Sequence, residues 1–186
     1  MKIALFGGSF DPPHFGHQKV ADYVVTQGIA DQVWFVPCAD HPFNKQISSI
    51  QHRMWMLRHA VSHPICTYEV NKTGKSYSYE TLRYFSSLFR NCSFCWIIGS
   101  DQLVKFTGWY QYQELLRNYP VLVYPREGFT LISDLPNMIM LTKAPTINIS
   151  SSQIRASAYN NKKLHIWVSP AIIGYIKKHQ LYEGAS

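Results

Sequence analysis

The sequence has no long apolar run, no tract of basic residues, no repeat and no low-complexity segment. No stretch reaches the roughly 18 consecutive apolar residues that a membrane-spanning helix needs. The apolar start at residues 1–6 is too short for a secretory signal peptide, and the scattered Lys and Arg residues form no basic arm for nucleic acid. We therefore expect one domain over residues 1–186 that works in the cytoplasm without a membrane or nucleic-acid partner. The sequence leaves a monomer and a homo-oligomer both open.

The charge balance of the chain is basic. Eighteen Lys and Arg against eleven Asp and Glu give a formal charge of +7, which favours anionic partners such as nucleotides, although many soluble enzymes are simply basic. Cys92 and Cys95 have the spacing of redox and zinc motifs. They fall in an apolar segment that is typical of a strand, where residues three apart point to opposite faces. We therefore expect ordinary buried thiols at these two positions.

Short apolar runs alternate along the chain with segments of helical periodicity. The runs expected to form strands are 3–6, 33–37, 65–70, 93–98, 121–124 and 138–141. The segments expected to form helices are 17–27, 50–61, 78–89, 111–118, 151–158 and 171–178. Strands alternating with helices predict an α/β fold, an open parallel sheet with helices on both faces.

The motif richest in chemistry follows the first expected strand and opens the first expected helix. It reads Gly7-Gly8-Ser9-Phe10-Asp11-Pro12-Pro13-His14-Phe15-Gly16-His17. Its glycines let a ligand approach the backbone closely, and a helix start offers free N–H groups and a positive dipole end to phosphate. His14 and His17 can project to one side and donate hydrogen bonds to phosphate oxygens. Without this histidine pair the segment would read as a glycine-rich turn, since it is neither G-x-G-x-x-G nor a Walker loop.

A second candidate phosphate site lies near the other end of the chain. The segment Ile149-Ser150-Ser151-Ser152-Gln153-Ile154-Arg155 combines hydroxyls and a helix start with an arginine one turn later. A serine run before a helix is by itself usually a cap. Paired with the first motif, it is better interpreted as the other half of a phosphate clamp.

These two motifs resemble the signatures of the nucleotidylyltransferase superfamily, which shares His-x-Gly-His with class I aminoacyl-tRNA synthetases. Ser152 stands where the second signature has threonine. The resemblance implies the Rossmann-like nucleotidylyltransferase fold. It implies that ATP is bound by Gly7, Gly8, Ser9, Phe10, Gly16, Gly99, Asp101, Ile149, Ser151 and Ser152. It also implies a catalytic group made of His14, His17, Lys45 and Arg155.

Further segments resemble the bacterial nicotinate-nucleotide adenylyltransferases. They are Lys45 with the Arg53-Met54 pair, residues 74–82, 98–110 and 124–128, and the C-terminal stretch 169–182. The chain departs from that family at residues 41–45, which read His-Pro-Phe-Asn-Lys where the family has Pro-Pro-His-Lys, and at Gln102. The resemblance implies an acceptor site formed by Arg53, Ser78, Tyr79, Trp109, Tyr110 and Arg126.

Several of these residues have a plainer interpretation. Asp101 can cap the helix that follows it, Trp109 can fill the core, and Lys45 and Arg53 can be solvated surface residues. These alternatives stay open at the level of the sequence.

The resemblance implies transfer of AMP from ATP to nicotinate mononucleotide, giving nicotinate adenine dinucleotide and pyrophosphate in NAD biosynthesis. Mg²⁺ would arrive with ATP and not on a protein site, because Asp11 and Asp101 are isolated carboxylates. The alternatives are another phosphate-bearing acceptor, such as nicotinamide mononucleotide or phosphopantetheine, and a nucleotide- or RNA-binding module without activity. The intact His14, His17 and Arg155 favour the enzyme.

Overall fold

The computed structural model describes residues 1–40, 46–159 and 164–184. Its centre is a five-stranded sheet in the order β2-β1-β3-β4-β5, with every neighbouring pair parallel. The strands are β1 (Lys2–Gly8), β2 (Gln32–Pro37), β3 (Ser93–Gly99), β4 (Val121–Tyr124) and β5 (Met138–Met140). The strand order reverses between β1 and β3, and open α/β sheets bind ligands at such a point, beyond the carboxyl ends of the strands.

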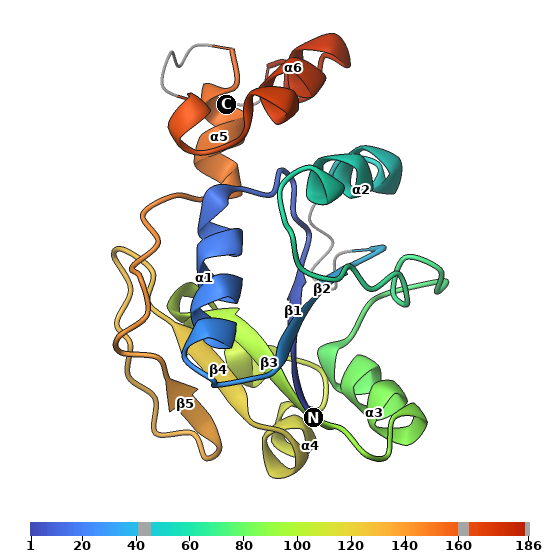
Figure 1. Ribbon diagram of the computed structural model, residues 1–186, viewed down its shortest axis with the longest axis vertical. Coiled ribbons are helices and arrows are strands. Elements are labelled where there is room, and N and C mark those ends of the chain that lie inside the picture. The colour runs from blue at the N-terminus through green and yellow to red at the C-terminus, as the bar shows by residue number, and fades with distance from the viewer. Residues whose placement is uncertain (41–45, 160–163, 185–186) are drawn as a thin grey trace.

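Helices cover both faces of this sheet. They are α1 (Phe15–Thr26), α2 (Ile50–Arg58), α3 (Ser78–Leu88), α4 (Tyr112–Asn118), α5 (Ser151–Ser157) and α6 (Pro170–Lys178), with the 3₁₀ segments η1 (Ser100–Gly108) and η2 (Leu164–Ile166). Figure 1 shows α5 and α6 gathered beside α2 and the start of α1. In the described part of the chain, no helix has both the length and the apolar character needed to cross a membrane.

Alternate residues of each strand feed two separate cores, one on each face. On β1, Ala4 and Phe6 pack with α1, α2, α5 and α6, whereas Ile3 and Leu5 pack with α3, α4 and η1. This period of two is what a sheet covered on both sides requires. The expected α/β fold is therefore confirmed.

The structure also corrects part of the expected secondary structure. The strand expected at 65–70 is wrong: Ile65 makes one isolated bridge to Phe35, and the chain then turns, with the N–H of Asn71 bonded to the carbonyl of Thr67. The apolar pattern at 65–70 suggested a strand, but the run contains Glu69. This side chain is buried and accepts a hydrogen bond from Thr81. The η1 segment was not expected.

The two cysteines that have metal-motif spacing lie on opposite faces of the sheet, as predicted. Cys95 belongs to the core under α1, and Cys92 packs against the core under α3. Both are free thiols.

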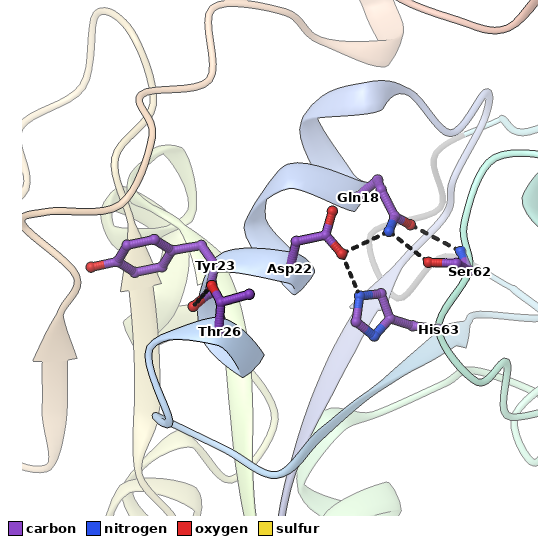
Figure 2. Close-up of polar contacts among 6 residues, drawn as sticks. All are labelled: Gln18, Asp22, Tyr23, Thr26, Ser62 and His63. Carbon is purple, nitrogen blue, oxygen red and sulfur yellow. Dashed lines mark hydrogen bonds and ion pairs between the residues drawn. The ribbon is translucent and has the colours of Figure 1, made fainter.

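A polar clamp joins α1 to the segment after α2 (Figure 2). Gln18 donates 2.8 Å hydrogen bonds to Asp22 and to the hydroxyl of Ser62, and the N–H of Ser62 donates back to Gln18 at 3.0 Å. His63 lies 2.9 Å from the same Asp22 oxygen. These contacts hold α1, including the N-terminal start of the helix, against the edge of the sheet.

Gly7, one residue before the end of β1, lies directly against an aromatic ring, so its lack of a side chain is a packing requirement. A Cβ at this position would collide with the indole of Trp96. We expect Gly7→Ala to lower the free energy of unfolding by about 1–3 kcal/mol through overpacking, measured by urea denaturation. Gly174→Ala on α6 is the control, because its Cβ meets no neighbour and alanine favours a helix. Equal stability of the two variants would contradict this account of Gly7.

Candidate active site

One cavity of about 560 Å³ opens at the carboxyl ends of β1, β3 and β4. The expected site residues on its wall are Gly7, Gly8, Ser9, Phe10, His14, His17, Ser78, Gly99, Asp101, Trp109, Tyr110, Arg126, Ser151 and Ser152. The two phosphate motifs thus meet at one cavity, although more than a hundred residues separate them in sequence. Lys45 lies outside the described residues.

The imidazoles of His14 and His17 stack at one end of this cavity, where phosphate binding was expected, with ring centroids 3.8 Å apart. The backbone N–H of His14 donates to Nδ1 of His17 at 3.1 Å. Because Nδ1 accepts this bond, the neutral ring of His17 carries its proton on Nε2, where it is a donor. Nδ1 of His14 is buried and has no hydrogen-bond partner among the residues that the structure describes. A buried polar atom of this kind at a cavity wall is a natural contact for a ligand.

Both histidines are neutral near pH 7. Burial, and to a smaller extent the positive charge of Arg126, lowers the pKa of His17 to about 3. Burial also lowers the pKa of His14 well below its usual value, with smaller effects from His17 and Arg126. Of the described residues that line this end of the cavity, Arg126 and not the imidazoles therefore supplies the positive charge.

Arg126 lies beside the histidines, although an acceptor contact was expected of it. Its Nη1 donates to the carbonyl of Ile149 at 2.6 Å, and its Nε is 3.6 Å from a carboxylate oxygen of Asp101. Arg126 therefore lies at the end of the cavity that holds the two histidines, and its expected contact with the acceptor stays a prediction. Asp101 does not cap η1, which begins without a side-chain cap, and a Cβ at Gly99 would collide with its carboxylate.

The start of α5 is tied to the loop after β1. The hydroxyl of Ser151 donates to the carbonyl of Pro12 at 2.8 Å, and Nη1 of Arg155 donates to the carbonyl of Asp11 at 2.8 Å. The hydroxyl of Ser150 caps the helix by accepting from Gln153 N–H at 3.2 Å, as its serine run predicted. Arg155 itself does not line the cavity, so its position favours holding the two motifs together.

Three further expected site residues lie off the cavity wall. Gly16 faces Ile147 and His14, which a Cβ would crowd, and the Ile149 side chain is part of the core. Tyr79 turns away and packs against the second core, with the guanidinium of Arg83 5.7 Å from its ring centroid. The expectation that Tyr79 faces the acceptor is wrong, because α3 begins at Ser78 and carries the next residue around to the sheet side.

Arg53 is a buried connector and not a ligand contact, which corrects the expectation for this residue. It is 1% exposed and donates to the carbonyls of Ser48, Ser9, Cys38 and Ala39 at 2.8–3.0 Å. Its guanidinium therefore joins the loop after β1 to the loop after β2. A sequence pattern cannot separate this role from a solvated one, since its partners are backbone carbonyls.

The far end of the cavity is aromatic. Trp109 packs on Phe106 with centroids 5.0 Å apart, and Tyr110 lies against Tyr77 at 4.6 Å. Tyr77 lines the wall together with Ser76 and Glu69, and sequence reasoning missed all three. Tyr77 and Ser76 immediately precede the expected helix at 78–89. Their position was the available signal, because residues just before a helix lie beside its N-terminus, where a ligand was expected.

Among residues 1–40, 46–159 and 164–184, no three His, Cys, Asp or Glu side chains converge as metal ligands. The carboxylate oxygens of Asp11 accept hydrogen bonds from Tyr182 and Ser48. The carboxylate of Asp101 contacts Gln102 and Arg126. The donor set described is therefore not that of a protein-held divalent cation.

This combination of a parallel sheet, paired histidines and a second serine-bearing helix start defines a nucleotidyltransferase. Accordingly, residues 5–157 match the family described as Cytidylyltransferase-like. A protein named "probable nicotinate-nucleotide adenylyltransferase" from Salinibacter ruber is 35% identical and covers 98% of both chains. A protein of the same name from Caldicellulosiruptor bescii is also 35% identical, over 98% of this chain and 100% of its own.

The chain belongs to the nicotinate-nucleotide adenylyltransferase family, as its motifs predicted. The expectation of an enzyme that acts in NAD biosynthesis is thereby confirmed. Two Plasmodium falciparum nicotinic acid mononucleotide adenylyltransferase structures, complexed with NaAD and with APC, share the fold. Their TM-scores are 0.83 and 0.82 at 24% and 22% identity, over 98% of this chain and 97% of theirs.

The neutral histidines predict how stability depends on pH. An unfolded histidine titrates near its ordinary pKa of 6.5, whereas folding lowers the pKa of His17 to about 3. Below pH 6.5 the unfolded chain binds a proton at His17 that the folded chain does not bind. The free energy of unfolding therefore decreases as the pH is lowered. We expect His17→Asn to reduce the loss between pH 7 and pH 4 by roughly 2–4 kcal/mol, measured by denaturant titration. His59→Asn, on the exposed end of α2, is the control, and parallel profiles for wild type and His17→Asn would contradict the burial argument.

Proposed function

We propose that this chain transfers AMP from ATP to nicotinate mononucleotide, releasing pyrophosphate, and that it does so in the cytoplasm. The carrying observation is that Ser151 and Arg155 bond the carbonyls of Pro12 and Asp11. These bonds hold two helix starts, each suited to phosphate, at one cavity. The names of the relatives that match over their full length support the acceptor assigned here.

The reaction follows from the groups at the phosphate end. A phosphate oxygen of the acceptor attacks the α-phosphorus of ATP, and the bond from that phosphorus to the bridging oxygen of pyrophosphate breaks. A phosphate monoester dianion is already nucleophilic near neutral pH, so the chain needs no general base. Positioning and charge stabilisation carry such transfers. We assign the Nε2–H of His17 to the α-phosphate, and we assign His14, Arg126 and Ser151 to the remaining phosphate oxygens.

The aromatic stretch of the cavity receives the acceptor in this proposal. Trp109 and Tyr110 offer ring faces to a pyridine, and Asp101 offers a carboxylate to a ribose hydroxyl. Mg²⁺ would be held by the ATP phosphates, since the carboxylates of Asp11 and Asp101 already have partners within the protein. It would supply neutralisation of the phosphate charge, while the chain's own residues bind and orient the reactants.

The carboxylate form of the acceptor suits this end of the cavity better than the amide. A carboxylate accepts hydrogen bonds and donates none, and the start of α3 at Ser78 provides N–H groups with a favourable dipole. Glu80, a potential source of repulsion, is paired with Lys72 and lies off the cavity wall. Glu69 does line the cavity, but it accepts a hydrogen bond from Thr81 at 2.6 Å.

The role of His17 can be tested by removing its imidazole. We expect His17→Ala to lower kcat by about 10²–10³, because its hydrogen bond strengthens as charge develops in the transition state. ATP binding, measured by calorimetry, should weaken much less. His59→Ala is a control that removes an imidazole far from the cavity. Near wild-type turnover of His17→Ala would refute the assigned mechanism.

The choice of acceptor can be tested by steady-state kinetics with both pyridine mononucleotides. We expect kcat/KM to favour nicotinate mononucleotide by at least about tenfold. The amide of the nicotinamide form would point its NH₂ group, a hydrogen-bond donor, at the N–H donors of the cavity. Pyrophosphate release is the measured signal, with phosphopantetheine as a third acceptor. Equal use of the two mononucleotides, or preference for the amide, would refute this assignment and leave the family unchanged.

A further inference from the structure

Glu69 is a buried carboxylate on the cavity wall to which the mechanism gives no part. It is 4% exposed and lies in the turns between the isolated bridge of Ile65 and helix α3. Its Oε1 accepts from the hydroxyl of Thr81 at 2.6 Å. Burial raises the pKa of Glu69, while hydrogen bonding by Thr81 and then by Ser76 opposes that rise. A buried carboxylate is costly unless such partners surround it.

The two hydroxyls beside Glu69 stand on either side of the turn that enters α3. Ser76 precedes Tyr77 and Ser78, and Thr81 follows them within the first helical turn. The side chain of Glu69 therefore holds the helical end of this turn through the hydroxyl of Thr81, and it lies beside Ser76 at the other end, where both residues line the cavity. The residues between the two hydroxyls, Tyr77 and Ser78, form part of the cavity wall.

The same turn is fastened to the loop after β2. The N–H of Ala39 donates to the hydroxyl of Ser76 at 3.3 Å, and Asp40 and Lys75 form a parallel bridge. On its other side this loop is held by Arg53, which donates to the carbonyls of Cys38 and Ala39. A chain of polar contacts thus runs from Arg53 through Ala39 and Ser76 to Glu69.

We propose that Glu69 is a positioning residue that fixes the Ser76–Ser78 turn, and through it the acceptor end of the cavity. The inference rests on the proposed function, in that the acceptor occupies that end. Glu69 acts through the hydroxyls of Ser76 and Thr81 and does not touch the acceptor. A shift of the turn by about 1 Å misplaces a bound reactant, which costs far more in rate than the lost contact alone.

A direct contact between Glu69 and the acceptor makes the opposite prediction. A carboxylate that faced the acceptor would repel nicotinate, so Glu69→Gln would then improve its use. In the positioning role, Glu69→Gln weakens acceptor binding, because the glutamine amide turns a donor toward hydroxyls that need an acceptor.

The experiment compares four single variants and one double variant of the full chain. Glu69→Gln replaces the charge-assisted hydrogen bond by a weaker neutral one and puts an NH₂ group in place of one acceptor oxygen, Thr81→Val removes the hydrogen bond, and Thr81→Ser keeps the hydroxyl. Glu80→Gln is the matched control, because it makes the same chemical change in a glutamate paired with Lys72 outside the cavity. The measurements are kcat, KM for each reactant and Tm, with the dissociation constant of the mononucleotide from calorimetry.

We expect Glu69→Gln and Thr81→Val each to raise the acceptor KM and dissociation constant by about tenfold, with kcat and the KM for ATP within about threefold of wild type. The double variant Glu69→Gln/Thr81→Val should be no worse than either single variant, since both remove one interaction. Thr81→Ser and Glu80→Gln should behave as wild type.

An unchanged acceptor KM, an equal loss for ATP and acceptor, or better use of nicotinate would each overturn the proposal. If Glu69→Gln does not fold, the contrast between Thr81→Val and Thr81→Ser decides the question. The wild type is assayed first with both mononucleotides, and the one it binds more tightly is used throughout. A wrong choice of acceptor, or a wild type that binds without turnover, is therefore distinguished from a failure of the role given to Glu69.

Discussion

The active site depends on how Asp11 is held. Its buried carboxylate accepts from the hydroxyl of Tyr182 at 2.6 Å and from the N–H of Ser48 at 3.0 Å, while Arg155 holds its carbonyl. Three parts of the chain thus converge on the loop that carries the histidines. Burial of a carboxylate is costly unless hydrogen-bond partners surround it. The end of the cavity that carries the histidines therefore depends on α5, on the C-terminal segment and on the loop before α2.

Burial of the two histidines separates the residues that donate hydrogen bonds from the residue that carries positive charge. Burial lowers the pKa of both histidines well below its usual value, so in the proposed mechanism they act as oriented neutral donors and Arg126 supplies the cation beside them. A preorganised donor that needs no reorientation during the reaction is more effective than a mobile one. The edge contacts of His17 with Phe6 and Phe10, at 5.7 and 5.1 Å between centroids, supply that orientation.

Sequence reasoning found the sheet, the two phosphate motifs and the aromatic end, because periodicity, glycines and a histidine pair are local signals. It erred where tertiary contacts decide. The sequence does not reveal the backbone carbonyls to which Arg53 donates, so it cannot separate a buried Arg53 from a surface cation. The sequence also does not reveal that the buried Glu69 accepts from the hydroxyl of Thr81, so residues 65–70 resemble a strand. Tyr77 was missed in favour of Tyr79 because the residue at which α3 begins decides which of these two rings faces the cavity.

The hydrogen bond from Tyr182 to Asp11 joins positions 171 residues apart, and that separation has a consequence for the order of assembly. During synthesis the loop with both histidines leaves the ribosome early, whereas Tyr182 emerges only after β1–β5 and α1–α6 have been synthesised. Until then the carboxylate of Asp11 lacks the phenol from which it accepts a hydrogen bond in the folded chain. Contacts of such long sequence separation form slowly, so this part of the cavity wall is completed late in folding.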